Sequence, residues 1–419
     1  MSEVRDVDAP AGEERFALSM GEFIAITALL MAVTALTVDI MLVVLPDIAS
    51  DFSLVEQNHQ QFVITVYMGA FAFGHIFAGP LSDHMGRRPV LLMGLAIYIL
   101  GSALAVLADS FALLLAARAI QGFGAAGPRV VAVAVVRDRF VGREMSRVMS
   151  FVMTVFIVLP ILAPAMGSLI AMLGSWPPIF GFLFIYGCVL AIWVYLRLPE
   201  THPRTGPHAA PSVSTRDAVA TIVRSRQTVG YMFAVGFVFG ILLTYISMSQ
   251  QLFADVYGVV EWFPAVFASV AGGMIIATFV NARLVRSMGM RRLSHFAVLA
   301  TIVVCAAVCA FVLMGGHIPL IPLVGFLSLC FFLIGLVLPN FNSLAMEELG
   351  AVAGTGSSFV GFMMTGAGAL LGGIVGQFYD GTLRPLVIGF LAYSIMCLIA
   401  VAITERGRLM QPSPGESRN

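Results

Sequence analysis

The segment that decides the fold is Gly79-Pro80-Leu81-Ser82-Asp83-His84-Met85-Gly86-Arg87-Arg88-Pro89, a short polar loop between the apolar stretches 60–80 and 89–108. Each stretch has about the 20 residues that a helix needs to cross a bilayer. The segment Ala282-Arg283-Leu284-Val285-Arg286-Ser287-Met288-Gly289-Met290-Arg291 matches the first loop in its Leu, Met, Gly and second Arg at an offset of 203 residues. This echo predicts a chain built from two related halves.

The composition extends this pattern to the whole chain. Of the 419 residues, 59% are hydrophobic and only 11% are charged, which is too few charged groups for a water-soluble surface. A window of about 20 apolar residues predicts an all-α membrane protein with twelve membrane-spanning helices. The expected spans are 20–45, 60–80, 89–108, 111–135, 147–171, 178–198, 229–252, 262–283, 294–315, 319–342, 355–379 and 383–404.

The longest polar stretch, 199–228, divides these spans into two sets of six. It contains Pro199, Pro203, Pro207 and Pro211 at a regular spacing of four residues, which is typical of an extended, solvated linker. The expected parts are a cytoplasmic N-terminal tail (1–19), an N-terminal six-helix bundle (20–198), a cytoplasmic linker (199–228), a C-terminal six-helix bundle (229–404) and a cytoplasmic tail (405–419).

The distribution of arginine predicts the orientation. All 23 basic residues are arginine, and 20 of them fall in the tails, the linker or the loops on the same side of the membrane. Arg384 falls in a loop on the other side, and Arg118 and Arg129 fall inside a span. Because arginine-rich loops stay in the cytoplasm, we expect a multi-pass protein of the bacterial inner (cytoplasmic) membrane with both termini inside. The acidic N-terminus is not expected to be a cleaved signal peptide.

Several motifs carry a resemblance to a known family. The loop Gly79–Pro89 closely matches the signature of the major facilitator superfamily between its second and third helices. Arg118-Ala-Ile-Gln121-Gly122-Phe-Gly124 resembles the R-x-x-Q-G-x-G motif of its fourth helix. The resemblance extends over about residues 20–405. It implies two pseudo-symmetric six-helix bundles with a solute site between them.

Four further features resemble the drug/proton antiporters of the bicyclomycin/chloramphenicol-resistance (Bcr/CflA) type. Pro160-Ile-Leu-Ala-Pro164-Ala-Met-Gly167 resembles their helix 5 motif, and Asp39 resembles their acidic position in helix 1. Segments 339–342 and 350–355 resemble their helix 10–11 region. The sequence departs from the helix 5 motif at Leu159, where these antiporters carry glycine.

Asp39 is the expected proton-coupling residue, together with Arg118. Both are expected roughly 10–12 Å below the outer surface, at about 1.5 Å per residue. The resemblance implies that helices 1 and 4 line the cavity, where the two charges could interact. Burial favours a neutral carboxyl group and a nearby arginine favours a charged one, so we expect Asp39 to carry the transported proton. The alternative is a fixed Asp39–Arg118 pair that joins two helices.

The roles of two arginines stay open at this point. Arg118 is expected either to tune Asp39 or to donate hydrogen bonds to the backbone of helix 1. Arg129 is expected to extend toward water at the cytoplasmic end of its helix, and the alternative is that it faces the cavity.

The charged loops are expected to form a conformational latch at the cytoplasmic mouth. The resemblance implies that Asp83 docks at the N-terminus of helix 11, near Gly354, where the helix dipole favours an anion. It also implies that Arg87, which precedes Arg88, pairs with an acid such as Asp138 when the inner gate is shut. The alternative is that these charges only set the topology.

Other residues are candidates for bending and for binding. Pro160 and Pro164 remove two backbone donors and are expected to bend helix 5, with Gly167 as part of the same motif; tight packing and a moving hinge are equally open. Four residues are candidates for the substrate cavity: Tyr67, Gln121, Tyr245 and Asn340.

The predicted function is proton-coupled multidrug efflux by alternating access, exporting small lipophilic neutral or monocationic compounds. The alternative is a proton-coupled exporter of a metabolite such as an amino acid or a sugar. We find no HExxH, no GxSxG in a suitable context and no nucleotide loop, so we expect no catalytic site and no enzyme activity. We expect no metal site and no cofactor, with the proton motive force as the energy source. The expected partners are small-molecule drugs, protons and the lipid bilayer, without nucleic acid, and the expected state is a monomer.

Overall fold

The computed structural model describes residues 18–140, 142–201 and 215–411. The remaining parts of the expected tails and linker, with Arg5, Arg15, Arg204 and Arg418, lie outside the described residues. Within the described ranges every regular element is helical, and twelve helical segments are long and apolar enough to cross a membrane. The prediction of an all-α fold with twelve spans is confirmed.

The first half contains six spans, and the first of these is interrupted. It consists of α1 (Met20–Asp39), η1 (Leu42–Val44) and α2 (Leu45–Asp51). Pro46 lies in the first turn of α2, where it has no N–H to donate to the preceding turn, so it starts a new helix instead of continuing α1. The other five are α3 (Phe62–Met85), preceded by η2 (Gln57–Gln61), α4 (Arg87–Val106), α5 (Phe111–Arg139), α6 (Gly142–Ala171) and α7 (Pro177–Arg197).

The second half contains the remaining spans. They are α9 (Arg226–Tyr257), α10 (Phe263–Met288), α11 (Met290–Leu313), α12 (Leu320–Met346), α13 (Ala353–Gln377), preceded by η3 (Gly350–Val352), and α14 (Arg384–Thr404). Most helices extend beyond the expected apolar windows because their polar ends reach past the hydrocarbon. For example, α9 begins at Arg226, where the hydroxyl oxygen of Ser225 accepts a hydrogen bond from the N–H of Thr228 at 3.0 Å.

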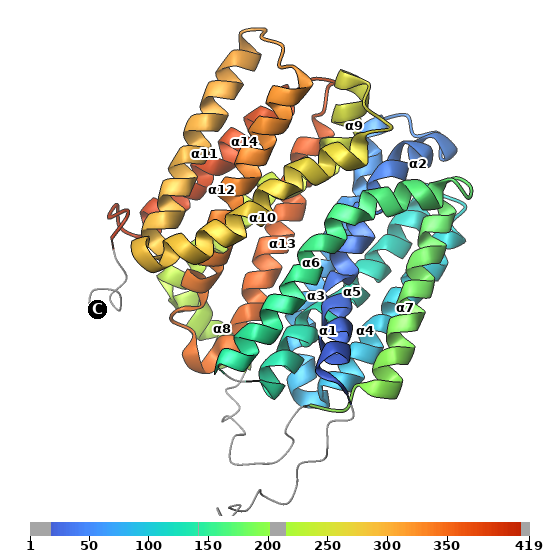
Figure 1. Ribbon diagram of the computed structural model, residues 1–419, viewed down its shortest axis with the longest axis vertical. Helices are drawn as coiled ribbons and strands as arrows, with labels where there is room; N and C mark the ends of the chain where they lie inside the picture. Colours follow the sequence, from blue (N-terminus) through green and yellow to red (C-terminus); the bar gives the residue numbers. More distant parts are fainter. Residues whose placement is uncertain (1–17, 141, 202–214, 412–419) are drawn as a thin grey trace, which may run out of the picture.

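Part of the expected extended linker is a helix, α8 (Thr215–Arg224). Ala218 and Ile222, one turn apart, are both buried, and α8 packs against α9 and α13 (Figure 1). The expectation of an extended chain does not hold here because the regular prolines end at Pro211. Beyond that residue an apolar helical stripe can form and be buried.

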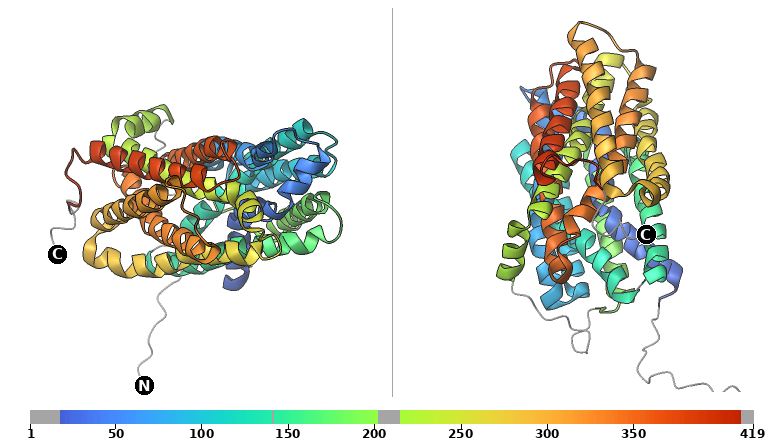
Figure 2. Two further views of the ribbon diagram at one scale, coloured as in Figure 1. Left: turned by 90° about the horizontal axis from the view of Figure 1, so that it is seen from above. Right: turned by 90° about the vertical axis from the view of Figure 1, so that its left-hand side faces the viewer.

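The same helix pairs occur in both halves, which lie side by side (Figures 1 and 2). In the first half α1 packs on α6, α3 on α5 and α4 on α7; in the second half α9 packs on α13, α10 on α12 and α11 on α14. Across the halves α3 packs against α13 and α6 against α10. The second span of each half therefore meets the fifth span of the other, as pseudo-twofold symmetry requires.

The two echoed loops have the same backbone. Gly86 adopts φ 102° and ψ 162°, and Gly289, 203 residues later, adopts φ 76° and ψ 160°. Residues with a side chain rarely adopt this conformation. It allows α3 and α10 to end and α4 and α11 to begin within one residue. These loops lie at the end of the molecule that we call the arginine-rich end, shared by the loops α3–α4 and α10–α11; the end at which α4 and α11 stop is the arginine-poor end.

Candidate functional site

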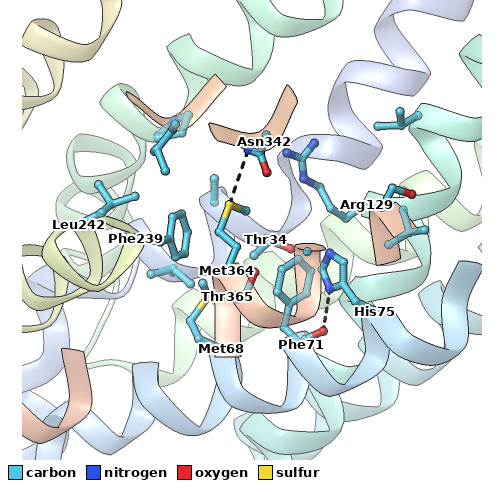
Figure 3. A pocket seen from close by; sticks show the side chains of 18 of the residues that line it. Thr34, Met68, Phe71, His75, Arg129, Phe239, Leu242, Asn342, Met364 and Thr365 are labelled. Carbon is cyan, nitrogen blue, oxygen red and sulfur yellow. Dashed lines mark hydrogen bonds between the residues drawn. The ribbon is translucent and has the colours of Figure 1, made fainter. Parts of the chain in front are cut away.

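A cavity of about 540 Å³ lies between the two halves. It is lined by α1, α3, α5 and α6 of the first half, by α9, α10, α12 and α13 of the second, and by Arg87 at the start of α4. Asp39, Phe267 and Phe331 line its deep part, and Asp83 and Arg137 line it at the arginine-rich end. Figure 3 shows part of its wall. The cavity therefore extends from the level of Asp39 toward the arginine-rich end.

Hydrogen bonds between the halves close the arginine-poor end. Gln61 donates from Nε2 to Oε1 of Gln251 at 2.6 Å, and Asn58 donates from Nδ2 to the carbonyl of Tyr379 at 2.7 Å. Gln377 donates in return from Nε2 to the carbonyl of Asn58 at 3.0 Å. These four side chains form what we call the outer cluster, which joins η2 to α9 and the end of α13.

Asp39 is the last residue of α1 and lines the cavity with only 4% of its surface exposed. Within the described chain its carboxyl group makes no hydrogen bond and no ion pair. Because the first span continues to Asp51, Asp39 lies about 18 Å along the span from its arginine-poor end, at about 1.5 Å per residue. It is therefore deeper than the expected 10–12 Å. An acid at such a depth is a candidate for the binding of a proton or a cation.

Arg118 is fully buried, but it does not reach Asp39. Its Nε donates to the carbonyl of Val63 in α3 at 3.0 Å, and its Nη1 donates to Oε1 of Gln121 at 2.5 Å. Its guanidinium lies over the ring of Tyr67, 4.2 Å from the centroid. A direct contact with Asp39 is absent among the described residues. The backbone that Arg118 binds belongs to the second span, not to the first.

The four residues expected to line the cavity lie behind its wall. Tyr67 covers Arg118, and Gln121 donates from Nε2 to Ser102 at 2.8 Å. The ring of Tyr245 packs against Phe331, 4.9 Å between centroids, so that Phe331 faces the cavity instead. Asn340 donates from Nδ2 to Oδ1 of Asn281 at 2.8 Å and joins α12 to α10. None of the four is among the lining residues. The expectation failed because Gln121 and Asn340 hydrogen-bond to neighbouring helices. The rings of Tyr67 and Tyr245 pack behind the wall, and their hydroxyl groups have no hydrogen-bond partner among the described residues.

Other polar residues, which the sequence motifs did not indicate, line the cavity in their place. They include Thr34, His75, Asn342 and Thr365 (Figure 3). Arg129 also lines the cavity. The structure thus agrees with the alternative that Arg129 faces the cavity, and not with the expectation that it extends toward water at the end of its helix. His75 carried a signal that could have identified it, because an ionisable residue inside a span is a functional candidate by default.

The proline/glycine motif of α6, the fifth span, lies beside Asp39. Pro160 lines the cavity, whereas Pro164 and Gly167 are buried. A Cβ atom added to Gly167 would overlap the carbonyl oxygen of Ile40, the residue after Asp39. The motif therefore packs α6 on the interrupted part of the first span.

The charges of the first echoed loop form a connected cluster. Nη1 of Arg87 lies 2.5 Å from Oδ1 of Asp83, and its Nε lies 2.7 Å from Oδ2 of Asp138. Oδ2 of Asp83 lies 3.7 Å from the position that a Cβ of Gly354 would occupy, in the first turn of α13. Glu200, which was not selected from the sequence, accepts hydrogen bonds from the N–H groups of Arg87 and Arg88 at 2.9 and 3.1 Å. It thereby caps the N-terminus of α4.

The second echoed loop has a corresponding cluster. Nε of Arg291 lies 3.0 Å from Oε1 of Glu405, and Nη2 lies 3.5 Å from Oε2 of Glu347. Tyr231 also donates to Glu405, at 2.7 Å. The offset of 203 residues relates Arg291 to Arg88, so that the sequence echo already pointed to this position.

Comparisons with known proteins agree with this architecture. Residues 27–373 match the family model Major Facilitator Superfamily. The chain is 32% identical over 376 residues to YdgK of Bacillus subtilis, an uncharacterised MFS-type transporter, covering 88% of this chain and 90% of that protein. It is 28% identical over 387 residues to a bicyclomycin resistance protein homologue of Haemophilus influenzae, covering 90% and 94%. It is 31% identical over 241 residues to multidrug resistance protein MdtL of Escherichia coli, covering 57% and 60%.

Solved structures share the fold. A bacterial homologue of the human lysosomal transporter Spinster, in an inward-facing and occupied conformation, superposes with a TM-score of 0.71 at 15% identity, over 96% of this chain and all of that one. The cavity between two related six-helix halves, the echoed loops and the match over residues 27–373 lead to one conclusion: the chain is a membrane transporter, not an enzyme, and belongs to the major facilitator superfamily.

Proposed function

We propose that this transporter exports small lipophilic neutral or monocationic compounds in exchange for protons, by alternating access. The observation that carries the proposal is Asp39, a buried acid without a protein partner among the described residues, in the wall of the cavity between the halves. A charged carboxylate is costly at this depth. It is stabilised by a proton, by water in an open cavity or by a cationic substrate.

The proposed cycle uses this property. With the cavity open to the cytoplasm, Asp39 releases its proton and a substrate enters. With the cavity open to the other side, the substrate leaves and Asp39 takes up a proton, so that the neutral site returns. A membrane potential supplies about 2.3 kcal/mol per charge for each 100 mV. No other cofactor is needed, and one chain contains the whole cycle, so we propose a monomer.

The orientation in this proposal rests on the arginines. The loops of the arginine-rich end belong in the cytoplasm by the positive-inside rule, which places both termini there and the outer cluster at the periplasmic face of a bacterial inner membrane. In this orientation the cavity of the structure extends toward the cytoplasm.

Arg118 and the charged loop have indirect roles in the proposal. Arg118 holds α3 and α5 together, and α5 packs against α1, the helix that ends at Asp39. Arg118 is therefore a positioning residue for proton coupling. Asp83, Arg87, Arg88 and Asp138 act as the latch of the cytoplasmic gate, because contacts made in one state bias the equilibrium between states. The relatives' names, which include bicyclomycin and multidrug resistance, favour drugs over metabolites as substrates.

The test is proton release from the purified protein on addition of a drug. Weakly buffered protein in detergent should release protons when chloramphenicol is added, and Asp39→Asn should bind the drug without releasing protons. Asp47→Asn is the matched control, because Asp47 is exposed in α2 of the same span. Release by Asp39→Asn equal to that of the unchanged protein would contradict the proposal. A resistance screen in an efflux-deficient host, with amino acids and sugars as competing substrates, separates drug export from metabolite export.

A further inference from the structure

The cavity has an apolar side and a polar side (Figure 3). Phe239 and Leu242 of α9, with Met364 of α13 and Met68 of α3, form the apolar side. Flexible methionine and flat aromatic side chains adapt to varied lipophilic surfaces. The polar groups are therefore the part of the wall that distinguishes one lipophilic molecule from another.

Arg129 and His75 form the polar side at one depth. Arg129 lies ten residues before the end of α5 at Arg139, and His75 lies ten residues before the end of α3 at Met85. At 1.5 Å per residue, each is about 15 Å from the arginine-rich end, whereas Asp39 is about 28 Å from it. Both side chains line the cavity, and they lie on the same side of the view in Figure 3. The cationic group thus lies on the route from the cytoplasmic mouth to Asp39.

The hydrogen bond of His75 defines what its ring presents to the cavity. Nδ1 of His75 lies 2.9 Å from the carbonyl oxygen of Phe71. Because a carbonyl oxygen only accepts, Nδ1 carries the proton, and Nε2 of the neutral ring is left as an acceptor. The side chain is 7% exposed, and its Nε2 has no hydrogen-bond partner among the described residues. An acceptor in the wall of the cavity, without a protein partner among the described residues, fits a donor on a bound molecule.

The charges of the wall also favour an electron-rich group. Among the described lining residues there are three arginines, Arg87, Arg129 and Arg137, and two aspartates, Asp39 and Asp83. Arg87 and Asp83 pair with each other. Arg129 is therefore the charged lining residue at the level of His75 within the described chain, and the acid Asp39 lies deeper. A plain lipophilic cation gains nothing at this level.

We propose that Arg129 and His75 are a specificity subsite for a hydrogen-bonding oxygen group of the transported molecule. Arg129 donates to a carbonyl, nitro or carboxylate oxygen, and His75 accepts from a neighbouring N–H or O–H. The lipophilic body lies on the apolar side. The substrate class is therefore a neutral or zwitterionic lipophile with such a group, rather than a lipophilic cation without one. This inference rests on the proposed export of lipophilic compounds and specifies their chemistry.

The test is equilibrium binding to the purified full-length protein in detergent. The probes are radiolabelled chloramphenicol, a neutral molecule with nitro, amide and hydroxyl groups, and tetraphenylphosphonium, a lipophilic cation without them. The unchanged protein should prefer chloramphenicol. Arg129→Met should weaken chloramphenicol binding about tenfold, which corresponds to about 1.4 kcal/mol, and leave tetraphenylphosphonium binding unchanged or tighter. Arg129→Lys should fall between, because it keeps the charge and loses the planar fork.

The second variant and the control keep the test decisive. His75→Phe retains the ring and removes Nε2, so it should weaken chloramphenicol binding several-fold and not that of the cation. Arg286→Met removes an exposed arginine outside the cavity and should change neither. Equal loss of both probes in Arg129→Met and His75→Phe, no loss in either variant, or no preference in the unchanged protein would overturn the subsite. Binding needs no proton gradient. An absence of proton release would therefore contradict the proposed proton coupling and would leave the measured binding preference unaffected.

Discussion

Gly167 of α6 lies directly against the main-chain carbonyl of Ile40, so that a Cβ atom on Gly167 would overlap that oxygen. Ile40 follows Asp39, at the point where the first span is interrupted. The close approach explains why the proline/glycine motif of α6 is found next to the membrane-embedded acid. Because residue 167 is glycine, α6 can approach the interruption between α1 and η1 closely. Asp39 lies at this interruption and faces the cavity.

Gly167→Ala should therefore disturb the site of Asp39. Overpacking of this kind costs about 1–3 kcal/mol, so we expect a lower thermal midpoint in detergent and reduced drug export. Gly181→Ala is the matched control: Gly181 of α7 has no atom within 4 Å of an added Cβ, and alanine in a helix is at worst neutral there. If both variants melt at the temperature of the unchanged protein, the contact of Gly167 with Ile40 does not contribute to the stability of the protein.

Arg118→Met should destabilise the first half. It removes two hydrogen bonds from a charged donor, each worth about 1.5–3 kcal/mol, together with the contact with Tyr67. A cycle of Arg118→Met, Gln121→Ala and the double variant should be non-additive, because the two side chains share a hydrogen bond at 2.5 Å. The thermal midpoints measure both effects. A variant that melts normally and yet loses proton coupling would show that Arg118 acts on Asp39 by charge and not by positioning.

The two acids bound to Arg87 should differ in their effect. Asp138 has 13% of its side chain exposed and Asp83 has 47%. Removal of Asp138 leaves a buried arginine without its main partner, which costs several kcal/mol, so Asp138→Ala should lower the thermal midpoint. Asp83→Ala should leave stability nearly unchanged, because exposed pairs contribute about 0–1 kcal/mol. As a latch residue, however, it should slow transport with little change in drug affinity. A large loss of affinity in Asp83→Ala would exclude the latch.

The outer cluster should hold the arginine-poor end closed. Gln251→Ala removes the hydrogen bond with Gln61, worth about 1 kcal/mol, and should shift the population about fivefold toward states open at that end. Spin labels at Val55 and Val260, exposed in opposite halves, would report the change as longer distances. Gln57→Ala, at an exposed residue of η2, is the control. An unchanged distance distribution in Gln251→Ala would show that the outer cluster does not influence the equilibrium between the closed and open states of this end.

Some features of this protein follow from the sequence alone. Twelve apolar stretches determine twelve helices because a backbone in lipid must satisfy its own hydrogen bonds. The repeated loop at Gly86 and Gly289 indicates a fold of two related halves, because Leu, Met, Gly and Arg recur together at an offset of 203 residues. The isolated acid Asp39 was identifiable because a charge within a span is rare.

Only the tertiary structure decided which polar side chains face the cavity. Helices in a membrane bundle are apolar on the lipid side and on the packed side alike, so periodicity does not distinguish a cavity wall from a helix contact. Gln121 and Asn340 therefore looked like ligands and prove to join helices, whereas His75 and Arg129 line the cavity. The position of Gly167 against Ile40 could not be predicted from the sequence either, because it depends on where two separate spans cross.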